Sequence, residues 1–163
     1  MEHDEYRLIG ELINYYAGQP KRIQHALKVY SFADMIATGE KLDVDLRKTI
    51  VLAAIVHDAG IKIAEEKYGR SDGPLQEKEG PEVATRMLEA IGTDRKRTER
   101  IAFLVGHHHT YSGVEGIDWR ILLEADFLVN AFEHALTGKA LQEGYDRIFR
   151  TETGRSIFRT MFA

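Results

Sequence analysis

The chain has 163 residues and a formal net charge of -4, with 44% hydrophobic and 29% charged residues. This composition is typical of a soluble globular protein, and the length suits one domain. The absence of cysteine excludes disulfides, thiolate metal sites and cysteine nucleophiles. A metal site would therefore use imidazole and carboxylate ligands, which favours Mn, Fe, Co, Ni, Zn or Mg.

Charge and hydropathy also limit the expected partners. The first seven residues are acidic and polar, without a basic leader before an apolar stretch, so we expect no signal peptide. The longest wholly apolar run, residues 50–56, is far too short to cross a bilayer. We therefore expect a cytoplasmic protein without a membrane partner. Nucleic acid is not expected either, because the net charge is negative and the basic cluster at residues 95–100 has acidic neighbours.

Helical periodicity runs through almost the whole chain, and no stretch alternates apolar and polar residues as a strand would. We predict an all-α, single-domain helical bundle over residues 1–163, and the sequence leaves its oligomeric state open. The expected helices cover residues 4–17, 21–38, 44–57, 61–68, 81–91, 94–108 and 118–136, followed by a less regular helical tail at 139–162. The expected loops lie at 69–73 and 113–116.

Start and stop residues define several of these boundaries. Pro81 is expected in the first turn of the fifth helix, where proline is tolerated. Asp43 is the expected N-cap of the third helix, and Gly60 marks its expected end. Gly92 and Thr93 are the expected stop and cap before the sixth helix.

The third predicted helix is apolar on every side from Ile50 to Val56, which indicates a helix buried at the centre of the domain. It ends in His57 and Asp58. A carboxylate there is costly because it is buried and lies near the negative end of the helix dipole. A bound cation would offset both costs. The alternative is that Asp58 caps a turn and His57 is an ordinary core histidine, and a lone His-Asp pair would favour that interpretation.

Two further helices bring polar side chains to their buried faces. On the second predicted helix, His25 shares an apolar face with Val29 and Ile36 at helical spacing. On the seventh, Asp126 shares a face with Leu122. Three core-facing helices thus supply two imidazoles and two carboxylates, a set that suits a metal site with room for water or substrate.

The order of these residues resembles the HD superfamily of metal-dependent phosphohydrolases. The matching segments are RIQHAL at 22–27, AAIVHDAG at 53–60 and ILLEAD at 121–126, within a resemblance that extends over about residues 20–130. It implies an HD-type bundle with a central metal site. The implied ligands are His25, His57, Asp58 and Asp126, with Asp58 also placed to bridge to a second ion if there is one. The implied reaction is hydrolysis of a phosphate ester by a metal-activated water.

A second metal site in this family uses another histidine and a later His-His pair. The first position is Gln76 here, a poor ligand that puts the second ion in doubt, although the adjacent Glu77 could partly substitute. The pair corresponds to His108 and His109, or to His107 and His108 if the match shifts by one residue. We expect His108 and His109 to have a catalytic role, contacting the substrate phosphate or donating a proton. The alternative is a set of exposed histidines at a helix end.

Three basic residues are candidates for phosphate contacts. Arg22 lies about one helical turn before His25, and Lys62 follows the His-Asp pair closely. Arg70 lies in the loop at 69–73, which could close over a substrate. For each of them alone, a solvated surface role is the alternative.

The leading hypothesis is a phosphohydrolase acting on a small phosphorylated molecule, with nucleotides as the leading substrate class. One alternative is a di-iron oxygenase on the same fold, which needs more ligands than this chain clearly supplies. Another is a non-catalytic HD-type regulatory or binding domain, against which the four intact ligand positions argue.

Overall fold

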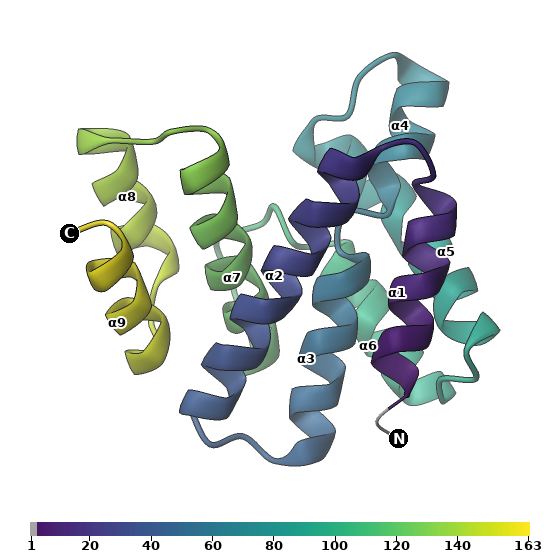
Figure 1. The fold of residues 1–163 in the computed structure, drawn as a ribbon, viewed down its shortest axis with the longest axis horizontal. Helices are drawn as coiled ribbons and strands as arrows, with labels where there is room; N and C mark the ends of the chain where they lie inside the picture. Colours follow the sequence, from purple (N-terminus) through teal and green to yellow (C-terminus); the bar gives the residue numbers. More distant parts are fainter. Residues whose placement is uncertain (1–2) are drawn as a thin grey trace.

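The computed structural model describes residues 3–163, and within that range all regular structure is helical. The predicted all-α fold is confirmed. The helices are α1 (Asp4–Tyr15), α2 (Pro20–Gly39), α3 (Val44–Val56), α4 (Gly60–Tyr68), α5 (Gly73–Ala90), α6 (Arg95–Val105), α7 (Ile117–Glu133), α8 (Gly138–Ile148) and α9 (Glu152–Met161) (Figure 1). In the described part of the chain, no helix has the length and apolarity needed to cross a membrane.

Helix α3 lies at the centre of the bundle. Helices α1, α2, α6 and α7 pack against it, and α2 also packs along α7. Every residue from Thr49 to Val56 is buried, as the unbroken apolar run predicts. Helices α8 and α9 form an outer pair beside α7, on the side away from α3 (Figure 1). The facing sides of α2, α3 and α7 therefore define the middle of the molecule.

The start of α3 follows the prediction, but the residue after its end does not. Asp43 is the N-cap, and its side chain accepts a hydrogen bond from the backbone N–H of Leu46 at 2.8 Å. Gly60 begins α4 instead of ending α3, and its φ is not positive. It is a glycine for a different reason: a Cβ there would lie 2.6 Å from the backbone nitrogen of Gly80 on α5. Only glycine allows the two helices to approach this closely.

The predicted start of the fifth helix is wrong. Helix α5 begins at Gly73, so Pro81 lies inside it and not in its first turn. An internal proline costs about 3 kcal/mol, and tertiary contacts of the preceding turns offset this cost. The Gln76 side chain donates to the carbonyl of Ser71 at 2.7 Å, and Glu77 accepts from the backbone N–H of His109 at 2.9 Å.

The predicted cap of α6 and its C-terminal end also need correction. Gly92 is left-handed, with φ +80°, as a helix stop should be. The N-cap is Asp94 and not Thr93, because the Asp94 carboxylate accepts from the backbone N–H of Arg97 at 2.9 Å. The helix ends at Val105, so the three consecutive histidines lie in the turn that follows.

The helical tail predicted at residues 139–162 consists of two helices. Helix α8 ends at Ile148, and α9 starts at Glu152. The fully buried Glu124 of α7 causes the break. Its carboxylate accepts from the backbone N–H groups of Arg150 and Thr151 at 2.6 and 2.9 Å, which removes these donors from helical hydrogen bonding.

Candidate metal centre

Side chains from α2, α7 and the end of α3 meet at one buried point. The Nε2 atoms of His25 and His57 lie 3.2 Å apart, and each lies 3.2 Å from Oδ1 of Asp126. Oδ2 of Asp58 lies 3.2 Å from His25 Nε2 and 3.4 Å from His57 Nε2. The structure thus brings together all four residues that the sequence suggested as ligands.

Hydrogen bonds at Nδ1 orient the histidine rings. The three bonds join His25 to Glu133 Oε1 at 3.0 Å, His57 to the Ala54 carbonyl at 2.7 Å and His108 to the Val105 carbonyl at 2.7 Å. Because these partners accept, Nδ1 carries the proton and Nε2 presents a lone pair in each neutral ring.

Lone pairs from imidazole nitrogens and carboxylate oxygens therefore face one another at the point of convergence. Once the rings have lost their second proton, as metal binding requires, no donor lies among these atoms to relieve the repulsion. A cation there would be coordinated by all of them, so the donor set fits a divalent metal ion.

The electrostatics of the metal-free residues lead to the same conclusion. Burial alone would lower the pKa of His57, but the carboxylates of Asp58 and Asp126 outweigh it and raise that pKa well above its usual value. Burial would raise the pKa of Asp58, yet the imidazoles of His57 and His108 lower that pKa well below the usual range. The pKa of Asp126 is lowered for the same reason, against its burial. The centre favours positive charge among ionised carboxylates.

A second group of ligand atoms shares Asp58 with the first. Oδ1 of Asp58, the oxygen turned away from His25, lies 3.2 Å from Nε2 of His108. Asp58, His108 and His109 each offer a ligand atom within 4.8 Å of the others. Gln76 Oε1 lies 3.2 Å from His108 Nε2 and 2.9 Å from His109 Nε2. Asp58 therefore lies between two clusters, one facing each of its oxygens.

The three consecutive histidines point in different directions. His108 is fully buried and, with His109, faces Asp58, whereas the ring of His107 stacks on Phe103 with centroids 4.0 Å apart. Burial and the neighbouring His108 lower the pKa of His109 to about 4, so His109 is neutral at neutral pH. Glu77 is not turned to the site as a ligand, because its carboxylate accepts from the backbone of His109.

Residues 22–141 match the model described as the HD domain, and this range includes all the candidate ligands. The chain belongs to the HD domain family. A similar solved structure is the crystal structure of a predicted HD superfamily hydrolase from an uncultured Thermotogales bacterium, with a TM-score of 0.66 and 23% identity over 94% of this chain and 82% of that one. This likeness supports the fold. No curated protein matches the chain significantly.

A cavity of about 690 Å³ opens onto the candidate metal centre. His25, Asp58 and Asp126 form part of its wall, so the candidate ligands can be reached from outside. The other lining residues are Gln19, Pro20, Lys21, Arg22, Ile61, Ser71, Gln76, His109, Tyr111, Leu123, Phe127, Asn130, His134 and Arg147.

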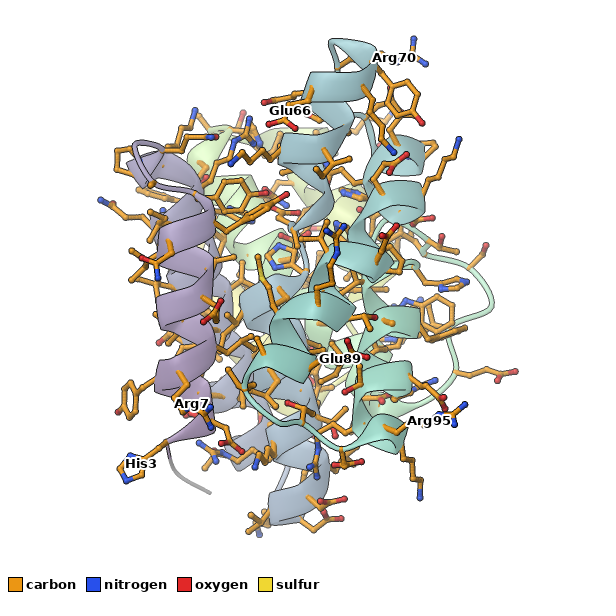
Figure 2. The ribbon with its side chains drawn as sticks, turned by 90° about the vertical axis from the view of Figure 1, so that its right-hand side faces the viewer. His3, Arg7, Glu66, Arg70, Glu89 and Arg95 are labelled. Carbon is orange, nitrogen blue, oxygen red and sulfur yellow. The ribbon has the colours of Figure 1, made fainter. Side chains whose placement is uncertain are left out.

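Of the three predicted phosphate contacts, Arg22 alone lines this cavity. Its guanidinium pairs with Glu65 at 2.5 Å. Lys62 instead donates to the backbone carbonyl of Tyr15 at 3.1 Å. Arg70 points outward at one end of the molecule, as Figure 2 shows, and its side chain is 72% exposed.

Sequence reasoning missed several residues of this site. Asn130 on α7 and His134 directly after it follow Asp126 at four-residue steps, so helical periodicity places both on the face of Asp126, although it does not assign them to the site. Glu133 follows Asp126 by seven residues, so the same periodicity places it on this face, but its partner, the far side of the His25 ring, comes from another helix and has no sequence signal. Arg147 comes from α8, whose position beside α7 no local pattern reveals.

Proposed function

We propose that this HD domain is a metal-dependent phosphohydrolase that cleaves a phosphate ester of a small, nucleotide-sized molecule. One observation carries the proposal: the Nε2 atoms of His25 and His57 converge with the carboxylates of Asp58 and Asp126 at the wall of an open cavity. The cavity volume of about 690 Å³ lies within the range of pockets for small organic ligands.

A divalent ion held by these four residues would lower the pKa of water and neutralise charge on phosphoryl oxygens. The residues around the ion would hold it and attract the substrate. The carboxylates of Asp58 and Asp126 stay ionised and hold the positive charge in place. Arg22, at the cavity wall, attracts the phosphate of the incoming substrate. Hydrolysis by water then requires no nucleophilic side chain, which suits a chain without cysteine.

We also propose a second ion between Asp58, His108 and His109. The support is the orientation of Asp58, whose two oxygens face different histidines, and the neutral state of His109 at neutral pH. The amide oxygen of Gln76 points into the same cluster, since its amide nitrogen is bound to Ser71. The competing role for the two histidines is a direct contact with phosphate or donation of a proton.

The metal content of variants separates these roles. Protein purified without chelator is analysed for bound metal as wild type and as His108→Ala. A fall from about two ions to one supports the second site. Unchanged metal content together with lost turnover supports a substrate contact instead. His107→Ala is the matched control, because His107 stacks on Phe103 outside the cluster.

The central proposal is tested with Asp58→Ala, which removes the ligand shared by both clusters. Turnover is measured with a panel of nucleotides and p-nitrophenyl phosphate in the presence of Mn, Co, Ni or Mg. We expect the variant to lose bound metal and activity, while Asp72→Ala, on the surface, keeps both. An Asp58→Ala protein with full activity would contradict the proposal. Two bound irons with oxygen uptake would favour the di-iron oxygenase. Bound metal without turnover of any substrate would favour the non-catalytic regulatory domain.

A further inference from the structure

Outside the metal centre, the charged side chains that line the cavity are positive. Apart from the metal-centre carboxylates Asp58 and Asp126, none of the acidic residues within 3–163 lines it. Three cationic side chains do so, those of Lys21, Arg22 and Arg147. The whole chain has a net charge of -4, so this cavity is a local exception to an acidic protein. Such an excess of positive charge favours an anionic ligand.

Two of these cations have no counter-ion in the described residues. Arg22 is paired with Glu65. Lys21 and Arg147, in contrast, have no carboxylate within ion-pair distance anywhere in residues 3–163. They come from different helices, Lys21 from the first turn of α2 and Arg147 from α8. Both side chains are therefore available to a ligand in the cavity.

The position of Arg147 is fixed without use of its hydrogen-bond donors. Its guanidinium carbon lies 4.5 Å from the ring centroid of Tyr111, which also lines the cavity. A cation over an aromatic face is held by the π electrons, so the N–H groups of the guanidinium stay free. Guanidinium groups bind phosphate and carboxylate through paired, charge-assisted hydrogen bonds.

Arg147 also lies outside the part of the chain common to the family. The HD match ends at residue 141, whereas Arg147 follows on α8, which packs against α7. The candidate metal ligands, in contrast, all come from within the match. A cation supplied from beyond it is suited to recognising the rest of the substrate.

We propose that the substrate carries a second anionic group besides the phosphate that is cleaved, and that Arg147, positioned by Tyr111 and assisted by Lys21, binds it. This inference rests on the proposed phosphohydrolase function. The substrate class is a small bis-anionic phosphate ester, whose second group is another phosphate or a carboxylate.

The test compares substrates that differ only in the second charge. A nucleoside 3′,5′-bisphosphate is compared with the matching 5′-monophosphate, phosphoserine supplies a carboxylate, and p-nitrophenyl phosphate has no second anion. For Arg147→Gln we expect the ratio of kcat/KM for the bisphosphate over that for the monophosphate to fall by about tenfold or more, mainly through KM. Arg147→Lys should restore part of the ratio. Lys139→Gln, which removes the same charge from an exposed site on α8, should leave the ratio unchanged.

Equal losses for both nucleotides would overturn the inference, since Arg147 would then bind the cleaved phosphate. An unchanged ratio would overturn it as well. The role of Tyr111 is tested with Tyr111→Leu, which should lower the ratio, and with Tyr111→Phe, which keeps the ring under Arg147 and should preserve most of it. If Tyr111→Leu leaves the ratio at the wild-type value, the positioning role is wrong.

A binding measurement separates this inference from the proposed function. The same nucleotides are titrated into Mn²⁺-loaded protein by calorimetry, with wild type and Arg147→Gln side by side. Suppose that the wild-type protein has no phosphatase activity but binds the bisphosphate about tenfold more tightly than the monophosphate, and that Arg147→Gln binds both equally. This result would support the second-anion site and refute the hydrolase. Equal binding of both nucleotides by wild type refutes the second-anion site whatever the activity.

Discussion

Glu133 Oε1 lies 3.0 Å from Nδ1 of His25, on the side of the ring that faces away from the metal centre. The amine of Lys28 lies 3.0 Å from the same oxygen. Burial alone would raise the pKa of Glu133, but Lys28 and His25 outweigh it and lower that pKa. An ionised carboxylate in this position fixes the ring and makes Nε2 a better ligand. Glu133 therefore supports the metal centre without belonging to its ligands.

Removal of Glu133 should weaken metal binding while the fold persists. For Glu133→Ala we expect the Kd for Mn²⁺ to rise by about 10- to 100-fold, as measured by calorimetry. The Kd of Glu133→Gln should lie between those of Glu133→Ala and wild type, because an amide oxygen still accepts from Nδ1 but carries no charge. Glu143→Ala, on the exposed side of α8, is the control. Wild-type affinity in Glu133→Ala would show that the contact does not support the site.

Metal binding should release protons. Asp58 and Asp126 raise the pKa of His57 in the metal-free protein despite its burial, so the ring is protonated at neutral pH. A metal ion competes with this proton for Nε2, and its apparent affinity should therefore increase with pH. We expect about a tenfold increase per pH unit for one displaced proton between about pH 6 and 8. Calorimetry in buffers of different ionisation enthalpy measures the proton count. An affinity independent of pH over this range would contradict the prediction.

Sequence patterns predicted the ligands because His25 and Asp126 lie on the buried faces of their helices, and His57 and Asp58 directly follow a buried helix. His25 and Asp126 share faces with apolar neighbours, and the unbroken apolar run of α3 places His57 and Asp58 at the centre. These are local patterns, and the structure brings the four residues to one point. The all-α fold follows from the same periodicity.

The remaining parts of the site depend on contacts between distant segments. The sequence predicts a helix only from residue 81, whereas the turn that carries Gln76 is already helical because tertiary contacts offset the cost of Pro81. Arg147 enters the cavity only because α8 packs beside α7. Lys62 lies close to the HD pair in sequence, yet its amine is bound to the backbone of Tyr15. Sequence distance from a ligand therefore predicts little about which cations face the substrate.

The contact between Gly60 and α5 gives a stability prediction. A Cβ at residue 60 would lie 2.6 Å from both the carbonyl oxygen of Gln76 and the backbone nitrogen of Gly80, and backbone atoms cannot move away cheaply. Gly60→Ala should lower the free energy of unfolding by about 1–3 kcal/mol, measured by chemical denaturation. Gly10→Ala is the matched control, because that helical glycine has open space around it and alanine favours the helix. Equal stability of the two variants would show that α4 and α5 can separate without cost.

The carboxylate of Glu124 should be essential for the attachment of the last two helices. It accepts from the backbone N–H groups of Arg150 and Thr151 and, at 2.6 Å, from the hydroxyl of Thr151. Glu124→Ala leaves these donors without their charged acceptor in a buried place, where each such bond contributes about 1.5–3 kcal/mol. The bonds are not additive, so we expect a total loss of about 3 kcal/mol.

Thermal unfolding should detect this loss as a fall in Tm of roughly 6–12 °C, since 1 kcal/mol shifts the Tm of a domain of this size by about 2–4 °C. The exposed Glu89→Ala on α5 controls for the loss of one negative charge. Hydrogen exchange of the variant should show lost protection in α8 and α9 before the helices of the metal centre. Unchanged protection there, or a Tm within the error of the control, would mean that packing of Phe149 and Phe158 holds the two helices without Glu124.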